Sequence, residues 1–266
     1  MTSDFLRVER HGPVALLTLD RPDTRNALSG EECFGGFERV FAALNADTSV
    51  RAAVLTGAGS AFCSGGNVAE MRDRTGMFGG SPEQIAQNYR QGIQRIPRAF
   101  QTLQVPIIAA VNGAAMGAGN DLACMCDIRI ASTTAKFAES FVKVGIVPGD
   151  GGCWFLPRIV GFSRAAEMAL TGETLGADEA LRIGLVSRVV EPEALMEAAM
   201  ALAHRIAANP PQVLRWTKQL LLQARTGTLD EALDTAGRFQ GLAHHTADHV
   251  EAVASFFEKR PPVFKG

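Results

Sequence analysis

Two stretches of small residues could hold a reacting group through backbone N–H donors alone. They are Ser64-Gly65-Gly66-Asn67 and Ala115-Met116-Gly117-Ala118-Gly119, and each comes after an apolar segment of strand length. The start of a helix exposes unpaired N–H groups at the positive end of the helix dipole. Two such groups pointing at one carbonyl would stabilise an enolate or a tetrahedral oxyanion. Tight packing of a helix on a strand explains the same small residues, so the pattern alone leaves both interpretations open.

The glycine spacing is not that of a nucleotide site. A dinucleotide fingerprint has its close glycine pair first, directly after a strand, whereas Gly113, Gly117 and Gly119 put the close pair last. A phosphate-binding loop would need a Gly-Lys-Ser/Thr triplet, which the sequence lacks. The two stretches therefore favour acyl chemistry over nucleotide chemistry.

Apolar runs alternate with helical periodicity in the first half of the chain, which indicates an α/β fold with buried, largely parallel strands. A polar, glycine-rich loop is expected over residues 73–81, and Pro97 is expected to kink or break its helix. Helical segments dominate after residue 150. The strands are expected at 14–19, 52–56, 105–111, 128–131 and 136–138, and the helices at 28–44, 84–103, 121–126, 163–170, 177–183, 192–208, 211–225 and 229–257.

The composition excludes several classes of protein. The 266 residues carry a formal net charge of −2, which is not the basic surface that nucleic-acid binding needs. No uninterrupted apolar stretch is long enough to span a membrane, and the first residues contain no signal-peptide core. The five cysteines form no Cys-x-x-Cys pair, so we expect reduced packing residues in a cytoplasmic protein.

Six motifs, in order along nearly the whole chain, resemble those of the crotonase superfamily, the enoyl-CoA hydratase/isomerase family. They are RPDTRNALS (21–29), GSAFCSGGNVAEM (59–71), VPIIAAVNGAAMGAGNDLACMCDIRIAS (105–132), KVGIVPGDGG (143–152), LTGETLGADEALRIGLVSRVV (170–190) and FFEKRPPVF (256–264). The resemblance implies an α/β crotonase (ClpP-like) spiral of repeated β-β-α units over residues 1–195 and a C-terminal helical trimerisation region over residues 196–266. It also implies a homotrimer or a dimer of trimers that acts on an acyl-CoA thioester. Neither a metal nor a separate cofactor is implied, since coenzyme A is part of the substrate.

The same resemblance assigns the binding residues by position. The two oxyanion N–H groups fall on Gly66 and Ala118, or on Gly117 if the alignment slips by one residue. Lys259, followed by Arg260, falls where the family has a basic residue near the CoA phosphates, although a solvated helix end explains this pair equally well. The residues implied to line the adenine and pantetheine are Arg25, Ala27, Ser64, Asn67 and Val68, with Asn67 replacing the usual aspartate of the family.

The acid/base pair of the family's hydratases is altered in this sequence. Its two glutamates align with Asp121 and Phe141, and Phe141, which would line the substrate, cannot move a proton. Asp150 lies in the loop where isomerases, dehalogenases and related members carry a working carboxylate. Beside Phe141 it would be partly desolvated, with a raised pKa suited to a base near neutral pH. Both aspartates could instead be helix N-caps. Glu139 could substitute if residues 136–141 are a strand, since it would then share a face with Phe141.

A single base favours isomerisation of a 3-enoyl to a 2-enoyl thioester, including ring-derived substrates, through an enolate held by the oxyanion donors. Hydration by Asp121 and Asp150 is the second hypothesis, and a non-catalytic member that binds acyl-CoA or a protein is the third. The loop over 73–81 and the helix that follows are expected to set acyl specificity.

His244, His245 and His249 suggest a metal site, with His245 and His249 one helical turn apart, but a polar helix face or a subunit contact is favoured.

Overall fold

A six-stranded sheet forms the body of the molecule. In the computed structural model, which describes residues 5–266, its strand order is β1-β2-β3-β5-β7-β10. β1 is antiparallel to β2, and the other neighbouring strands are parallel. All residues of β3 and β5 are buried, as expected for strands covered on both faces. The strands are β1 (Leu6–His11), β2 (Val14–Leu19), β3 (Ala52–Gly57), β5 (Ile107–Val111), β7 (Ile128–Ser132) and β10 (Arg188–Val190).

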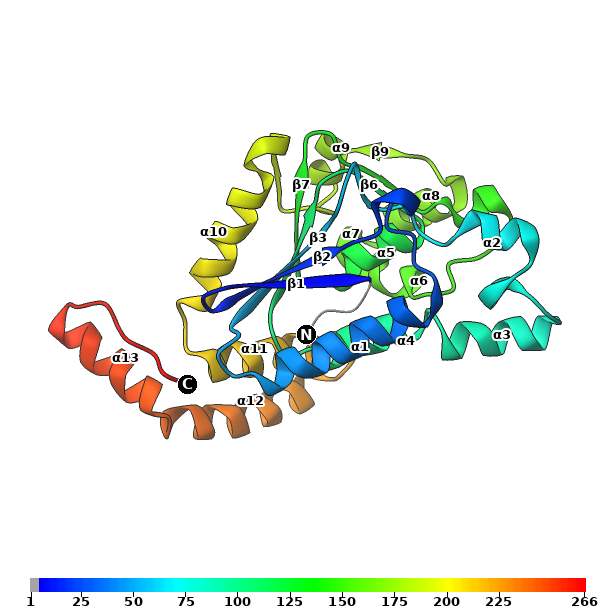
Figure 1. Cartoon of the computed structure of the whole chain (residues 1–266). Coiled ribbons are helices and arrows are strands. Elements are labelled where there is room, and N and C mark those ends of the chain that lie inside the picture. The colour runs from blue at the N-terminus through cyan, green and yellow to red at the C-terminus, as the bar shows by residue number, and fades with distance from the viewer. Residues whose placement is uncertain (1–4) are drawn as a thin grey trace.

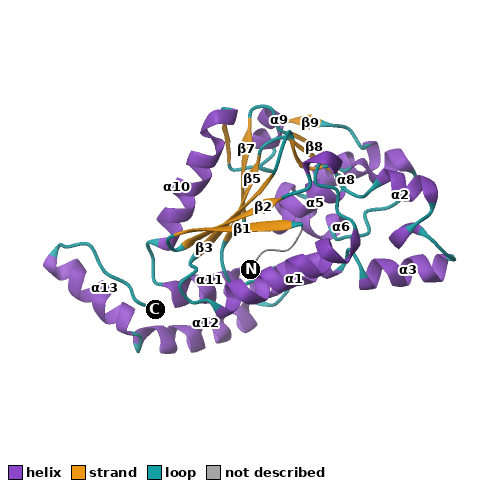
Figure 2. Ribbon diagram, viewed as in Figure 1, coloured by secondary structure: helices purple, strands orange, loops and turns teal. Residues whose placement is uncertain are grey.

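A second, four-stranded sheet of order β4-β6-β8-β9 completes the expected β-β-α repeat (Figure 2). β4, β6 and β8 each follow a strand of the large sheet after a short turn, and β4 and β6 then lead into α2 (Val68–Asp73) and α5 (Ala118–Met125). The repeated β-β-α units predicted from the sequence are therefore confirmed. β6 forms where we expect only a turn, because two alanines and a methionine among glycines give no strand signal. The strands are β4 (Ala61–Cys63), β6 (Ala114–Met116), β8 (Lys136–Ala138) and β9 (Leu175–Gly176).

Helices cover both faces of the large sheet (Figure 1). α1 (Gly30–Ala46) and α4 (Arg95–Thr102) cover one face through a cluster of aromatic rings whose centroids lie 4.8 to 6.2 Å apart. α10 (Leu195–Ala207) covers the other face with small residues, which allow close approach to the strands. The rings are Phe5, Phe37, Phe41 and Phe100, and the small residues of α10 are Ala199, Ala203 and Ala207.

Two of the expected helices are each divided in two. The segment 84–103 forms α3 (Pro82–Gln91) and α4, and the break lies at Gly92 rather than at Pro97. Pro97 is the third residue of α4, where a missing N–H costs no helical hydrogen bond. The segment 229–257 forms α12 (Leu229–His244) and α13 (Ala247–Glu258), because Thr246 caps a new helix through the N–H of His249.

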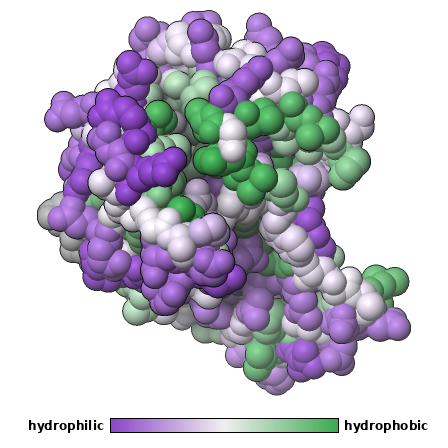
Figure 3. Space-filling view, turned by 90° about the vertical axis from the view of Figure 1, so that its right-hand side faces the viewer, coloured by the Kyte–Doolittle hydropathy of each residue, from purple (hydrophilic) through white to green (hydrophobic). Residues whose placement is uncertain are grey.

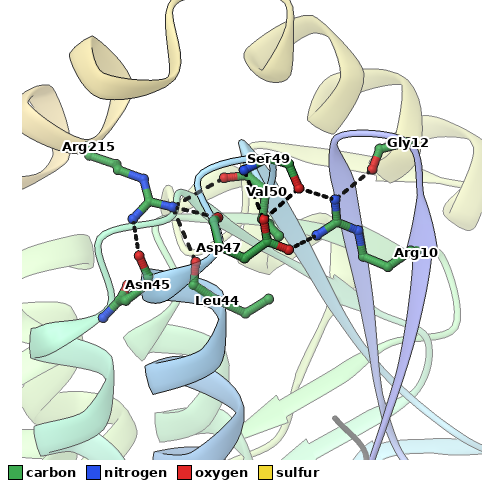
Figure 4. A network of polar contacts seen from close by, with 8 residues as sticks. All are labelled: Arg10, Gly12, Leu44, Asn45, Asp47, Ser49, Val50 and Arg215. Atoms are coloured by element: carbon green, nitrogen blue, oxygen red, sulfur yellow. Dashed lines mark hydrogen bonds and ion pairs between the residues drawn. The ribbon is translucent and has the colours of Figure 1, made fainter. Parts of the chain in front are cut away.

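α11 (Pro211–Ala224) attaches the C-terminal helices to the body. Arg215 donates to the carbonyls of Leu44, Asn45, Asp47 and Val50 at the end of α1 and the start of β3 (Figure 4). α12 and α13 then extend away from the sheets (Figure 1). No helix within residues 5–266 is long and apolar enough to cross a bilayer.

The remaining helices surround the second sheet. They are α6 (Gly152–Phe155), α7 (Pro157–Val160), α8 (Phe162–Thr171) and α9 (Ala177–Arg182), with short 3-10 turns at Gly76–Phe78 and Ser140–Val144.

Candidate active site

The two small-residue turns meet at one edge of the second sheet. β4 and β6 are parallel neighbours, so the turns that follow them leave the sheet on the same side. Gly65 lies so close to the second turn that a Cβ atom there would be 2.5 Å from the Met116 carbonyl oxygen and 3.4 Å from the Ala118 nitrogen. Its φ of 91° is also one that glycine adopts without strain. The small residues therefore serve a close approach of two backbone segments that each precede a helix.

The backbone hydrogen bonds distinguish the two possible donors of the second turn. The Gly117 N–H donates to the Ala138 carbonyl at 2.8 Å and is already used. Within residues 5–266, the N–H groups of Gly66 and Ala118 donate to no protein acceptor. The first N–H groups of a helix have no partner inside that helix, which accounts for Ala118 at the start of α5. Gly66 and Ala118 therefore hold the available donors at this edge, and Gly117 does not.

Three carboxyl groups from three different elements lie together beside the second turn. Asp121 is on α5, Glu139 follows β8 and Asp150 precedes α6, and their exposed fractions are 0%, 1% and 2%. A Cβ atom on Gly152 would collide with carboxyl oxygens of both Asp121 and Glu139, so those two groups are close neighbours. In the described chain, none of the three forms an ion pair with a basic side chain.

Burial without a cation keeps protons on this cluster. Desolvation, followed by the negative charges of Asp150 and Glu139, raises the pKa of Asp121 well above its ordinary value. Desolvation raises the pKa of Glu139 to about 7 and that of Asp150 to about 6, and a hydrogen bond to protonated Asp121 opposes both rises. Fully ionised, the oxygens of Asp121 and Asp150 would have no donor among the described residues. The cluster therefore holds both a base and a proton near neutral pH.

The helix-cap interpretation of the two aspartates is wrong. The N-cap of α6 is Gly151 with no side-chain cap, and Asp121 lies inside α5 rather than before it. The strand expected at 136–138 is confirmed as β8, but it does not continue to residue 141, because a 3-10 turn begins at Ser140. Glu139 and Phe141 therefore do not share a strand face. Glu139 nevertheless reaches the cluster, because this turn buries its side chain against α5 and α6.

Aromatic side chains lie beside the two turns that carry the amides and beside the loop that carries Asp150. A Cβ atom on Gly117 would lie 3.6 Å from the ring of Phe141. A Cβ atom on Gly66 would lie 3.6 Å from the ring of Phe78. Tyr89 on α3 contacts Gly149, and its ring packs edge to face on Phe78 at 6.3 Å. Sequence reasoning assigned Phe141 to the site but missed Phe78 and Tyr89. Phe78 lies in the loop, and Tyr89 in the helix, that are expected to set acyl specificity. Figure 3 shows apolar side chains gathered on the end of the molecule where α2 and α3 lie in Figure 1.

A profile described as Enoyl-CoA hydratase/isomerase matches residues 9–266. The chain belongs to the enoyl-CoA hydratase/isomerase family, within the crotonase superfamily. It is 37% identical over 256 residues to the short-chain-enoyl-CoA hydratase of Clostridium acetobutylicum, covering 95% of this chain and 94% of that protein. It is 38% identical over 259 residues to the 1,2-epoxyphenylacetyl-CoA isomerase of Escherichia coli, covering 95% of each.

The fold agrees with the same family. An enoyl-CoA hydratase from Bacillus anthracis superimposes with a TM-score of 0.91 and 32% identity, covering 99% of this chain and 100% of that one. The crotonase fold class predicted from the sequence is thus confirmed, and this family member is an enzyme of the hydratase/isomerase type. The family contains both reaction types, so the reaction has to be argued from the site.

The residues expected at coenzyme A form one rim in this hydratase/isomerase. The Ser64 N–H donates to the Arg25 carbonyl at 2.9 Å, and a parallel bridge joins Leu28 to Gly66. Asn67 caps α2 by accepting from the N–H groups of Ala69 and Glu70, the second and third residues of the helix, and an aspartate could accept the same two bonds. The rim residues are Arg25, Ala27, Ser64, Asn67 and Val68, of which Arg25 and Val68 are exposed and Ala27 is buried.

Two groups of predicted residues lie elsewhere in this family member. Lys259 is the C-cap of α13, which lies at the opposite end of the molecule from α2 (Figure 1), so it does not reach the site of its own chain. His245 and His249 are not one helical turn apart, since α12 ends at His244. Instead, His244 Nδ1 and His249 Nε2 lie 3.0 Å apart across the junction of α12 and α13.

Proposed function

We propose that this enzyme shifts the double bond of a 3-enoyl-CoA thioester to the 2-position. The observation that carries the proposal is the combination of Asp150, buried and ionisable near pH 6, with two unpaired amides and with Phe141 at the position of a hydratase glutamate. A double-bond shift needs one base and a stabilised enolate, whereas adding water needs a second polar group to activate that water.

In the proposed mechanism, the thioester oxygen accepts hydrogen bonds from the N–H groups of Gly66 and Ala118. Asp150 removes a proton from C2, and the electrons of that C–H bond form the enolate. The enolate then collapses, the double bond moves to C2–C3, and C4 takes the proton back from Asp150. Phe141 keeps water away from the intermediate, which strengthens both hydrogen bonds.

Asp121 is proposed to remain protonated and to donate to Asp150, which keeps the Asp150 carboxylate oriented in its ionised form. Arg25, Ala27, Ser64, Asn67 and Val68 are proposed to hold the adenine and pantetheine, with no other cofactor and no metal. Lys259 could contribute only from another copy of the chain.

Ring-bearing acyl groups are favoured as substrates. Phe78, Tyr89 and Phe141 provide aromatic faces and edges near the proposed enolate, and rings pack on such surfaces in offset or edge-to-face geometry. The similarity to the 1,2-epoxyphenylacetyl-CoA isomerase supports the same choice.

Absorbance of the conjugated thioester tests the proposal with two substrates. A rise on a 3-enoyl-CoA that is lost in Asp150→Asn supports the isomerase. A fall on a 2-trans-enoyl-CoA without any rise on the 3-enoyl-CoA contradicts it and supports hydration by Asp121 and Asp150. That second candidate is favoured by their shared burial and by the similarity to the short-chain-enoyl-CoA hydratase. No change with either substrate would support the binding-only alternative.

A further inference from the structure

Glu139 has no role in the one-base mechanism, yet its carboxyl group is buried against Asp121. It lies between the site and a small surface pocket of about 120 Å³, which α6, α7 and α8 form. Other walls of this pocket are apolar, and Phe162 at its edge is 81% exposed, so the pocket opens to solvent. The residues that line it include Glu139, Gly152, Cys153, Leu156, Phe162 and Ala169.

The groups that face Glu139 are themselves proton carriers or neutral thiols. Asp121 and Asp150 lie on its inner side, and the nearby Cys124 and Cys153 have raised thiol pKa values because burial disfavours their charged forms. No basic side chain in the described chain forms an ion pair with Glu139. Glu139 can therefore exchange a proton only with a neighbouring carboxyl group or with water in the pocket, because the described residues place no other base beside it.

We propose that Glu139 relays protons between the Asp121–Asp150 pair and water in the pocket formed by α6, α7 and α8. This inference rests on the proposed function, because it concerns the proton that Asp150 removes. Asp150 passes that proton to Asp121 as Asp121 passes its own to Glu139, and Glu139 releases one to pocket water. The isotope now on Asp121 then moves to the emptied Glu139 and exchanges there with a proton of pocket water, and that solvent proton returns through Asp121 to Asp150 and C4. Each transfer breaks one O–H bond and forms another. A deuteron taken from the substrate thus leaves through the pocket formed by α6, α7 and α8, while the bound thioester still covers the side of the site where Gly66 and Ala118 lie.

Deuterium at C2 of a 3-enoyl-CoA follows this route. In Glu139→Gln the amide cannot carry the proton, so we expect the ratio of deuterium transferred to C4 over deuterium lost to water to rise about tenfold. The isomerisation rate should change by much less than that ratio. Ala169→Leu, which fills the pocket and leaves every carboxyl group in place, should raise the ratio in the same direction. Glu173→Gln, an exposed carboxylate elsewhere, is the control and should leave it unchanged.

The relay is overturned if Glu139→Gln leaves the ratio of transferred to lost deuterium unchanged. It is also overturned if that ratio changes only in proportion to the isomerisation rate, which is what a purely structural role of Glu139 predicts. Exchange of the C2 hydrogens of butanoyl-CoA with D₂O separates this failure from that of the proposed function. Wild-type exchange without isomerisation refutes the isomerase, and the relay then stands or falls on whether Glu139→Gln slows that exchange about tenfold. Absence of both reactions in the wild-type enzyme overturns both.

Discussion

At the scale of single residues, the chemistry depends on what surrounds Asp150 rather than on the residue itself. An exposed aspartate is a weak base at neutral pH, whereas desolvation raises the pKa of Asp150 to about 6. Asp121 supplies the proton that makes this burial tolerable, since two ionised carboxyl groups without a cation would repel strongly in a dry site. The result is a base that is ionised at neutral pH and stronger than an ordinary carboxylate.

Asp150→Asn removes the base while preserving the size of the side chain. We expect kcat for the 3-enoyl-CoA to fall by about 10²- to 10⁴-fold and KM to change little, because the substrate still binds the amides. Steady-state kinetics measure both constants, with Glu173→Gln as the control for loss of a carboxylate. A variant that kept its kcat would show that Asp150 is not the base.

The pH dependence of activity and of stability should have opposite signs. Activity should rise with pH through about 6, as Asp150 becomes ionised. The folded pKa lies above the unfolded value of 3.8, so the contribution of Asp150 to stability is complete below that value and is lost as pH rises to about 6. Asp150→Asn should therefore stabilise the protein at pH 8, by about 3 kcal/mol relative to its effect at low pH. Thermal unfolding at both pH values measures this difference, and equal effects at both would contradict the shifted pKa.

At the scale of secondary structure, the site is a product of the β-β-α unit. Two such units side by side place two strand ends, two turns and two helix starts at one edge, so their amides meet without any side chain. Gly119 allows the contact, because a Cβ atom there would collide with the Cys63 carbonyl of β4. The third unit ends in a 3-10 turn rather than a helix, and this difference brings Glu139 and Phe141 to the site.

Gly119→Ala tests whether this close approach aligns the amides. The added methyl group must push α5 away from β4, so we expect a loss of about 1–3 kcal/mol in the free energy of unfolding together with a fall in kcat. Gly241→Ala is the matched control, since Gly241 lies in α12 with open space around it and should gain up to about 1 kcal/mol. Denaturant unfolding and kinetics on the pair provide the measurement. Full activity in Gly119→Ala would contradict the role of the contact.

At the scale of the whole molecule, the C-terminal helices are anchored but not covered. Arg215 and Lys218 fasten α11 to the body, Lys218 by an ion pair of 2.8 Å with Asp127. Beyond α11, the side chains of Phe256 and Phe257 are 78% and 77% exposed. An isolated chain seldom leaves such a surface in water. Residues 196–266 are therefore proposed to join copies of the chain around cores formed by residues 1–195.

Light scattering should report a homotrimer or a dimer of trimers across micromolar concentrations. Phe256→Glu combined with Phe257→Glu places charges on the exposed surface of α13 and should shift the protein toward monomer without unfolding the body, because neither ring contributes to the core of its own chain. Circular dichroism checks that the fold is retained. A wild-type monomer, or a double variant with an unchanged mass, would contradict the proposed interface.

Local signals in the sequence predicted most of the architecture. Apolar runs such as Val14–Leu19 became buried parallel strands, and the small-residue turns fell at the ends of strands, because strand burial and turn chemistry depend on a few neighbouring residues. β1, β4, β6, β9 and β10 were missed, since Leu6–His11 is mostly polar and the other four strands have only two or three residues each. The break at Gly92 was misplaced to Pro97, because the first turn of a helix tolerates proline.

Motifs along the chain were enough to identify the family and to select Gly66, Ala118, Asp121 and Asp150 as candidate residues. Three further facts came from the folded chain: the amide of Gly117 is already used, neither aspartate caps a helix, and Glu139 joins the two aspartates. The reason is physical: a hydrogen-bond partner, a desolvated carboxyl group and a shared proton depend on atoms brought together from distant parts of the chain. No local pattern specifies which side chains from three elements will meet in one place without water or a cation.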